Sequence, residues 1–188
     1  MCIRDRSYVR QLGAEVITVR AASNNKPFDN KIIDQIKPDL VLLSPGPGTP
    51  EEFSIPQLVG EICNRKIPAF GVCLGMQGIG QHFGAKLAQL PIPFHGKSSL
   101  IKHNEHEIFN KLPSEFEAGR YHSLYLDSVP QCLEIIASCE FEGKKIPMAI
   151  KHRELPIAAV QFHPESLMTL KDYAGHLILK NSIETLCS

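Results

Sequence analysis

The chain has 188 residues, 43% of them hydrophobic, which is enough for one sizeable globular domain with a buried core. Its 20 Lys and Arg residues balance 20 Asp and Glu residues, so no overall charge draws it to nucleic acid or to an anionic membrane surface. No apolar run is long enough to cross a membrane, so small molecules or another protein are the expected partners.

The six cysteines are scattered, with no C-x-x-C pair and no apolar leader segment ahead of them. This usage is typical of a reducing compartment, and we expect a cytoplasmic protein. The stretch HNEH at residues 103–106 contains two histidines, but no second ligand pair stands at a recognised metal-binding spacing. We therefore expect a solvated loop there, with no metal and no cofactor in this domain.

The predicted elements begin after residues 1–6 (MCIRDR), which do not fit the pattern that follows and which we interpret as a non-native scar. Residues 7–188 are then expected to form one domain. The segment 7–13 (SYVRQLG) ends in glycine and predicts a helix, and the β-branched run 14–20 (AEVITVR) predicts a strand. Together they would be the second half of a β-α-β unit.

The next segments continue the alternation of helix and strand. Asp29 can cap a helix over residues 29–37, in which Ile32, Ile33 and Ile36 share one face. The run 39–44 (DLVLLS) is then a fully apolar strand, as in a parallel sheet covered on both faces.

Three further segments repeat this pattern: a helix over 54–66, a buried strand over 67–73 and a helix over 74–84. Such alternation predicts an α/β fold, a doubly wound and mostly parallel sheet flanked by helices. In such sheets ligands bind beyond the carboxyl ends of the strands, so the turns at 44–50 (SPGPGTP) and 73–75 (CLG) should lie side by side.

The pattern changes at residue 86, where short strands with turn signals between them predict added antiparallel hairpins. The expected strands cover residues 86–90, 98–103, 118–127, 133–141, 146–152 and 156–162. Residues 170–186 close the chain as an amphipathic helix, with Ala174, Leu177, Ile178 and Leu179 on or near its apolar stripe.

Cys73 stands between Gly71 and Gly75 where a predicted strand runs into a helix, which is the G-x-S-x-G nucleophile elbow with sulfur in place of oxygen. The glycines give room for a strained turn, and helix N-terminal amides favour thiolate over thiol. The amide of Leu74 would point at an oxyanion formed on an attacked carbonyl. The competing interpretation is a small buried hydrophobe. We expect that role for Cys63, Cys132 and Cys139.

A thiol nucleophile needs a base, and His163 directly follows a predicted strand, with Glu165 two residues on. Pro164 stiffens the turn, so the carboxylate could set the tautomer and orientation of the imidazole. A histidine at a strand end is more often a hydrogen-bonded surface group. Combined with the elbow, the pattern favours a Cys-His-Glu triad.

Two other loops carry weaker signals. In SPGPGTP the amides of Gly46 and Gly48 stay exposed, and one of them could be a second oxyanion donor, although a simple turn would also explain the prolines. No G-K-[ST] follows, so a phosphate loop is not indicated. The run 120–126 (RYHSLYL) alternates as a strand that could present Ser123, and the segment around His95 and Gly96 reads equally well as a loop or a partner surface.

Five motifs in this order, SPGPGTP, GVCLGMQ, FHGK, RYHSL and QFHPES, resemble the class I glutamine amidotransferase family from about Ser7 to the C-terminus. Within it the chain looks most like the glutaminase component of anthranilate synthase, with the aminodeoxychorismate synthase component second. The resemblance implies the nucleophile at Cys73, the base at His163 and the orienting acid at Glu165. It places the glutamine contacts at Gly46, Pro47, Gly48, Leu74, Gln77, Ser123 and Leu124.

The resemblance also implies that the amides of Gly46 and Leu74 form the oxyanion hole and that glutamine is hydrolysed through a thioester. The family then passes ammonia to a synthase that aminates chorismate, in tryptophan biosynthesis for the anthranilate branch. The synthase can be a separate subunit or a domain fused in the same chain, and this sequence looks more like the fused forms. Rival functions are the folate, carbamoyl phosphate or guanine branches and a non-catalytic regulatory subunit.

Two departures from the family stand out. Met76 occupies a position where many anthranilate relatives carry His, although other branches use Met. The family's first strand and its Asp-containing turn precede the first helix, and neither has a counterpart here. We therefore expect the first strand of the sheet to be missing.

Overall fold

Three apolar runs form the parallel part of a central sheet in the computed structural model, which describes residues 3–20 and 28–188. In this part β1 (Val41–Leu43) pairs with β2 (Ala69–Val72), and β2 pairs with β9 (Ile157–Val160). Every residue of β2 and β9 is buried, because helices cover both faces of these strands. The carboxyl ends of the three strands therefore meet at one edge of the sheet.

Four antiparallel strands extend the sheet to seven strands, in the order β1-β2-β9-β8-β7-β4-β5. They are β4 (Lys97–His103), β5 (Glu115–Arg120), β7 (Leu133–Phe141) and β8 (Lys144–His152). The predicted hairpins are present: β7 pairs with β8, and β8 turns back to pair with β9. The expected α/β fold with added antiparallel hairpins is thus confirmed.

The strand predicted over residues 118–127 is wrong as a single element. β5 ends at Arg120, and β6 (Leu124–Ser128) pairs with β3 (Lys86–Gln89) in a separate two-stranded sheet. The break arises because the carbonyls of Arg120, His122 and Ser123 accept hydrogen bonds from the loop that precedes β4. Residues 121–123 therefore belong to neither ladder, because the carbonyls of His122 and Ser123 bond the loop instead of a neighbouring strand.

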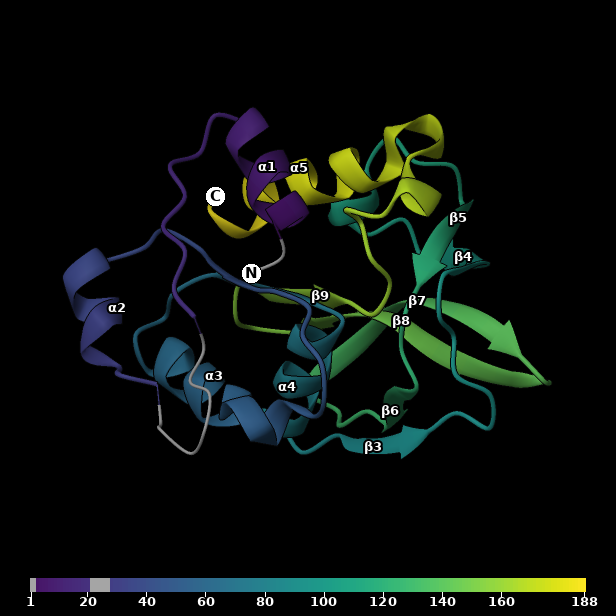
Figure 1. Ribbon diagram of the computed structural model, residues 1–188, viewed down its shortest axis with the longest axis horizontal. Coiled ribbons are helices and arrows are strands. Elements are labelled where there is room, and N and C mark those ends of the chain that lie inside the picture. Colours follow the sequence, from purple (N-terminus) through teal and green to yellow (C-terminus); the bar gives the residue numbers. More distant parts are fainter. Residues whose placement is uncertain (1–2, 21–27) are drawn as a thin grey trace.

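Helices cover the two faces of the sheet, as Figure 1 shows. α1 (Ile3–Gln11) lies beside α5 (Ala174–Leu186) on one face. The other face carries α3 (Ile55–Asn64) and α4 (Leu74–His82), with α2 (Lys31–Ile36) next to them. Short 3₁₀ helices connect these elements at η1 (Pro50–Phe53), η2 (Glu107–Phe109), η3 (Leu167–Thr169) and η4 (Lys171–Tyr173).

Each face of the sheet has its own hydrophobic cluster. The first cluster joins the sheet to α5 and includes the fully buried Phe162 and Ile178. The second joins the sheet to α2, α3 and α4 and includes the fully buried Ile62 and Met76. Burial of these side chains is the main stabilising contribution on either side of the sheet.

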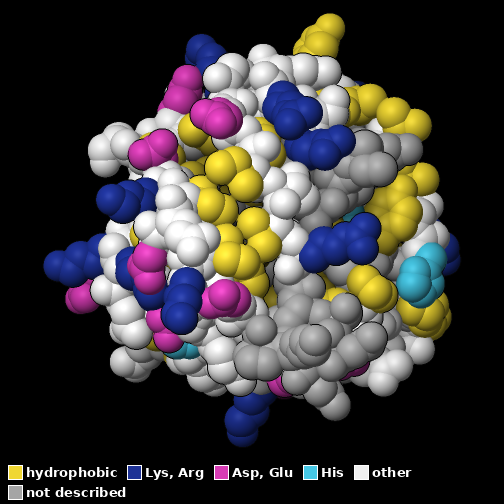
Figure 2. Space-filling view, turned by 60° about the vertical axis from the view of Figure 1, so that its left-hand side comes forward, with side chains coloured by type: hydrophobic (Ala, Val, Ile, Leu, Met, Phe, Trp, Pro, Cys, Tyr) yellow, Lys and Arg dark blue, Asp and Glu magenta, His cyan; other side chains and the backbone are white. Residues whose placement is uncertain are grey.

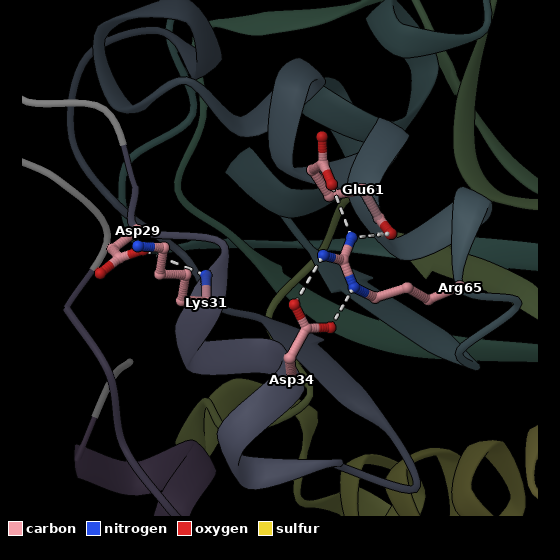
Figure 3. Close-up of polar contacts among 5 residues, drawn as sticks. All are labelled: Asp29, Lys31, Asp34, Glu61 and Arg65. Carbon is pink, nitrogen blue, oxygen red and sulfur yellow. Dashed lines mark hydrogen bonds and ion pairs between the residues drawn. The ribbon is translucent and has the colours of Figure 1, made fainter.

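The short helix α2 is held to α3 by a charged cluster, shown in Figure 3. Arg65 donates from Nε to Asp34 Oδ1 over 2.7 Å and from Nη2 to Asp34 Oδ2 over 3.1 Å, while its Nη1 lies 2.5 Å from Glu61 Oε2. The hydrogen bond to Arg65 lowers the pKa of Asp34. At the start of the helix, the predicted capping residue Asp29 accepts from the backbone amide of Lys31 over 3.1 Å.

The strand predicted over residues 14–20 is wrong, because these residues adopt no regular secondary structure. A strand needs a neighbour for its backbone groups. Among the described residues, β1 at this end of the sheet pairs with β2 alone, and no ladder includes residues 14–20. The preceding helix starts at Ile3, so residues 3–6 of the segment interpreted as a scar are helical, whereas residues 1–2 lie outside the described residues.

The surface mixes both signs of charge. On the face that Figure 2 brings forward, Lys and Arg side chains lie among Asp and Glu side chains, with hydrophobic side chains exposed between them. No helix within residues 3–20 and 28–188 is long and apolar enough to cross a membrane. The same ranges contain no group of three or more His, Cys, Asp or Glu side chains placed to hold a metal ion.

Candidate active site

Cys73 occupies a strained turn between a buried strand and a helix. Its backbone has φ 52° and ψ −101°, a conformation that non-glycine residues rarely adopt. Its amide donates to the carbonyl of Val160 over 2.8 Å, which fixes the turn to the end of the neighbouring strand β9. Its own carbonyl accepts from the amide of Gln77 over 3.1 Å and so opens helix α4. The strand-turn-helix arrangement predicted around Cys73 is therefore present.

The two flanking glycines are required by close backbone approach. A Cβ added to Gly75 would lie 2.2 Å from the carbonyl oxygen of Leu43 in β1. A Cβ added to Gly71 would lie 2.7 Å from the carbonyl carbon of Gly75. No side chain can occupy either position without moving the strand or the helix, and this packing holds Cys73 at the edge of the sheet.

His163 follows β9, which lies next to β2, so the fold brings His163 to the same edge as Cys73. Its Nδ1 lies 2.7 Å from Glu165 Oε1, and both side chains are largely buried. The backbone around the histidine is held as well. The amide of His163 donates to Gly119 O over 3.0 Å, and the hydroxyl of Thr169 donates to His163 O over 2.7 Å.

The environment of His163 favours its protonated form. Burial alone lowers the pKa of the imidazole, but interactions with the Cys73 sulfur and the Glu165 carboxylate outweigh burial and raise it to about 10. Since Nδ1 is paired with Glu165, the nitrogen that faces the sulfur is Nε2. That nitrogen is buried and has no hydrogen bond of ordinary length and angle to any described residue.

The loop between β1 and η1 lies beside the turn at Cys73, as expected for turns that follow neighbouring parallel strands. The predicted contact residues Gly46, Pro47 and Gly48 are all exposed. A Cβ added to Gly46 would lie 2.9 Å from Leu74 Cδ2, so the two predicted oxyanion residues are in contact. The loop thus presents backbone groups next to the N-terminus of α4.

Two other predicted contact residues are joined to each other. The side-chain amide of Gln77, which is 3% exposed, donates to Leu124 O over 3.1 Å and to Gln161 Oε1 over 3.2 Å. Ser123 precedes Leu124 in the short segment between β5 and β6, and its carbonyl accepts from Leu90 N over 2.7 Å. The structure therefore links this segment to α4, the helix that begins after Cys73.

Several residues around the site were not singled out from the sequence. The ring of Tyr121 contacts that of His163 edge-on, with centroids 5.0 Å apart, and Thr169 bridges His163 to Gly119. Arg120, at the end of β5, and His122, next to Ser123, form a buried hydrogen-bonded pair. A signal for Arg120 was available, because strand alternation places it on the same side of β5 as the buried Phe116 and Ala118.

The stretch HNEH has a structural role. His103 at the end of β4 is buried, donates from Nε2 to Pro113 O over 2.8 Å and accepts at Nδ1 from the amide of Glu105 over 3.1 Å. The expectation of a solvated loop is therefore wrong for this histidine, since packing on Phe109 and two hydrogen bonds hold it in place. In the FHGK segment, residues 94–96 form a loop whose amides at Phe94 and Gly96 donate to the carbonyls of His122 and Arg120, and Lys97 begins β4.

Fold and site together define an α/β protein with a cysteine at a nucleophile-elbow turn, next to a histidine paired with a glutamate. The model of the glutamine amidotransferase class-I family matches residues 5–184. The chain belongs to this family, as the resemblance of its motifs predicted.

Relatives of known name support this membership. The chain is 42% identical over 177 residues to anthranilate synthase component 2 of Thermus thermophilus, covering 94% of this chain and 83% of the relative. It is 40% identical over 180 residues to the aminodeoxychorismate/anthranilate synthase component 2 of Bacillus subtilis, covering 95% and 88%. It is 39% identical over 183 residues to an anthranilate synthase of Azospirillum brasilense. This match covers 96% of this chain but only 24% of that longer protein.

A solved structure shares the fold along nearly the whole chain. It is a putative GMP synthase subunit from Thermoplasma acidophilum, with a TM-score of 0.81 and 26% identity. The match covers 98% of this chain and 87% of that one.

Proposed function

We propose that this domain hydrolyses the side-chain amide of L-glutamine through Cys73, His163 and Glu165 and supplies the ammonia to a synthase that aminates chorismate, forming anthranilate. The observation that carries the proposal is the placement of Cys73 at a strained turn beside the buried His163–Glu165 pair, with 2.7 Å between Nδ1 and Oε1. The relatives named as anthranilate synthase component 2 support the choice of acceptor.

The first half-reaction forms a thioester. As the sulfur of Cys73 attacks the amide carbon of glutamine, the thiol proton is held on His163. The raised pKa of His163 keeps this proton on the ring at neutral pH. When the tetrahedral intermediate collapses, His163 gives the proton to the leaving nitrogen, and ammonia departs.

The oxyanion of the intermediate needs preorganised donors. The amide of Leu74 lies at the N-terminus of α4, where the helix dipole favours negative charge. The amide of Gly46 comes from the loop that packs against Leu74. We assign the oxyanion hole to these two amides.

The second half-reaction releases glutamate. A water molecule attacks the thioester, His163 accepts its proton, and the bond between the sulfur and the acyl carbon breaks to regenerate Cys73. In both half-reactions Glu165 accepts a hydrogen bond from Nδ1–H of His163. This bond holds the ring in the orientation that presents Nε2 to the sulfur.

Ammonia in neutral water is mostly ammonium, which is not a nucleophile, so transfer to the acceptor requires direct delivery to a synthase. The synthase is a separate subunit or a domain of the same chain. Relatives of both kinds exist, since the chain matches 83% of the Thermus thermophilus component and 24% of the longer Azospirillum brasilense protein.

The second candidate acceptor pathway is aminodeoxychorismate synthesis for folate. The name of the Bacillus subtilis relative includes both aminodeoxychorismate synthase and anthranilate synthase, which supports aminodeoxychorismate synthesis as the second candidate. Assays of the chain with each type of chorismate-aminating synthase would separate the two, because the products differ in the position of the new amino group.

Replacement of the nucleophile tests the proposed chemistry. Cys73→Ser should reduce glutamine-dependent amination by about 1,000-fold or more, since its hydroxyl is a far weaker nucleophile. Amination driven by added ammonium salt should remain, because that reaction bypasses the thioester. The measurement is the rate of product formation by the complex with the synthase, with each nitrogen source.

Cys63→Ser is the matched control, because it makes the same chemical change at a half-buried cysteine on α3. It should retain both activities. Labelled glutamine should form an acid-stable adduct with the unmodified chain and with Cys63→Ser. If Cys73→Ser still uses glutamine at the normal rate, the proposed nucleophile is wrong, and if no chain forms the adduct, a non-catalytic role for the domain replaces the proposal.

A further inference from the structure

Arg120, the last residue of β5, is a completely buried cation without an acidic partner. Its Nη1 donates to Ser99 Oγ over 3.1 Å, and its guanidinium carbon lies 3.6 Å from the ring centre of Phe94. No carboxylate within residues 3–20 and 28–188 forms an ion pair with it, and burial lowers its pKa. A buried cation without an ion-pair partner costs free energy, so its hydrogen bonds to neutral groups matter. Besides the bond to Ser99, Arg120 donates to His122.

That hydrogen bond fixes the state of a neighbouring histidine. Arg120 Nε donates to His122 Nε2 over 3.0 Å, and an arginine can only donate, so Nε2 carries no proton. The proton therefore lies on Nδ1, which donates to the carbonyl of Leu124 over 2.8 Å. Burial and the charge of Arg120 also lower the pKa of His122 to about 3, which keeps the ring neutral.

The carbonyl of Leu124 receives two donors, His122 Nδ1 and the side-chain amide of Gln77. Its two lone pairs are then both occupied, and the peptide group cannot rotate without breaking both bonds. The residues just before it lie outside any strand, and loop amides hold the carbonyls of His122 and Ser123. A chain of hydrogen bonds from a buried cation thus sets the backbone at Leu124.

We propose that Arg120 and His122 are positioning residues, which hold the backbone of Ser123 and Leu124 in the conformation that binds glutamine. This inference rests on the proposed function and on the glutamine contacts that the resemblance to the family places at Ser123 and Leu124. Without the Nδ1 donor the Leu124 peptide loses one of its two restraints, and glutamine binds more weakly. The acyl transfer at Cys73 keeps its rate once the site is filled.

Two substitutions separate the two nitrogens of His122. In His122→Asn the amide nitrogen takes the place of Nδ1 and can still donate to Leu124 O, but Arg120 loses its acceptor. In His122→Gln the amide reaches the place of Nε2 and can accept from Arg120, but the donor to Leu124 O is lost. A purely structural role of the histidine predicts no such difference in glutamine binding.

Two alkylating probes read the site in the full chain. A chloroketone analogue of glutamine reports binding through its half-saturating concentration and chemistry through its limiting rate of Cys73 labelling. Iodoacetamide lacks the amino and carboxyl groups of glutamine, so its rate of reaction at Cys73 reports the reactivity of the Cys73 sulfur alone. For His122→Gln we expect the half-saturating concentration to rise about three- to tenfold, the loss of one hydrogen bond, with both rates unchanged.

For His122→Asn we expect a half-saturating concentration within about twofold of the unmodified chain, together with a lower thermal midpoint because the buried Arg120 Nε is unpaired. Equal weakening in both variants, or none in His122→Gln, would overturn the proposal. If the unmodified chain is not labelled at Cys73 by the chloroketone, the proposed function itself fails and the inference falls with it.

A measurement on the unmodified chain covers the case in which neither variant folds. In spectra of the chain with ¹⁵N-labelled histidine, His122 should remain the neutral Nδ1–H tautomer between about pH 5 and pH 9. Its Nδ1–H signal should shift when the chloroketone occupies the site. A ring that titrates at the ordinary histidine pKa, carries its proton on Nε2 or gives no shift on labelling would contradict the assignment.

Discussion

At the scale of single residues, the fold raises the pKa of His163, the proposed catalytic base, and so links the stability of the chain to pH. Cys73 and Glu165 raise its pKa from the ordinary 6.5 to about 10 despite burial. A group whose pKa is higher in the folded chain stabilises the fold fully below its unfolded pKa, and this contribution is lost as the pH rises through the folded value. The window for His163 therefore runs from about pH 6.5 to about pH 10.

Glu165→Gln should lower the pKa of His163 and narrow this window, because a neutral amide cannot stabilise the imidazolium as the carboxylate does. The free energy of unfolding of the unmodified chain should exceed that of the variant most near pH 6.5. The difference should shrink as the pH approaches 10. Urea unfolding of both chains at several pH values gives these free energies.

Glu117→Gln is the control, since it makes the same change at an exposed position of β5. Its effect on unfolding should not follow the titration window of His163. A constant difference between Glu165→Gln and the unmodified chain from neutral pH to pH 10 would show that the carboxylate does not set the ionisation of the ring.

The sequence indicated the residues whose signals are local. Cys73 stands between two glycines after an apolar run, and His163 and Glu165 are separated only by Pro164, so their placement follows from neighbours in the chain. Arg120 and His122 could not be interpreted in this way. The charge of Arg120 is packed against Phe94, and the tautomer of His122 is set by the Leu124 carbonyl. These contacts depend on the end of β5 at Arg120, where the loop before β4 bonds the chain.

At the scale of elements, the unit formed by β2, the turn at Cys73 and α4 depends on how closely the helix approaches β1. Gly75→Ala would place a methyl group 2.2 Å from the carbonyl oxygen of Leu43. A backbone atom cannot move aside as a side chain can. We therefore expect a loss of about 1–3 kcal/mol or more of unfolding free energy, measured by urea denaturation.

Gly60→Ala is the matched control, because it adds the same methyl group to a helical glycine in α3. Its nearest contact would be 3.1 Å from His82 Cε1, at the end of a side chain that can shift. Alanine also favours helix over glycine by about 1 kcal/mol, so this variant should be neutral or more stable. Equal destabilisation by both substitutions would refute the argument from close approach at Gly75.

Elements could be predicted from the sequence wherever the pattern and the neighbours agree. The alternating helices and strands from residue 29 to residue 84 are present because each strand finds a parallel partner and each helix an apolar face. The β-branched run 14–20 has strand propensity but no pairing partner among the described residues. The alternating run 118–127 is divided because loop amides bind its central carbonyls. Neither the missing partner of residues 14–20 within the described chain nor the loop bonds to residues 118–127 can be predicted from local strand propensity.

At the scale of the whole molecule, the sheet is shared by two hydrophobic clusters, and the site lies at its edge. β2 and β9 contribute residues to both clusters, Phe70 and Ala69 being neighbours in one strand that face opposite sides. A loss of packing on either face therefore weakens the strands that carry Cys73 and His163. We expect the two faces to unfold together as one cooperative unit.

Ile62→Ala and Ile178→Ala test this expectation, because each removes a fully buried side chain from a different cluster. Each should lower the unfolding free energy by about 2–5 kcal/mol, and the double variant should show nearly the sum, because the two sites lie in separate clusters on opposite faces of the sheet. Far-UV circular dichroism reports all elements. Tyrosine fluorescence reports the four tyrosines, of which Tyr125 is buried in the first cluster and Tyr8 packs against it. If the faces are coupled, both signals must change at the same urea concentration in every variant. Separate midpoints in Ile62→Ala would mean that the α3 side can open while the α5 side stays folded, and the sheet would then not be the element that joins them.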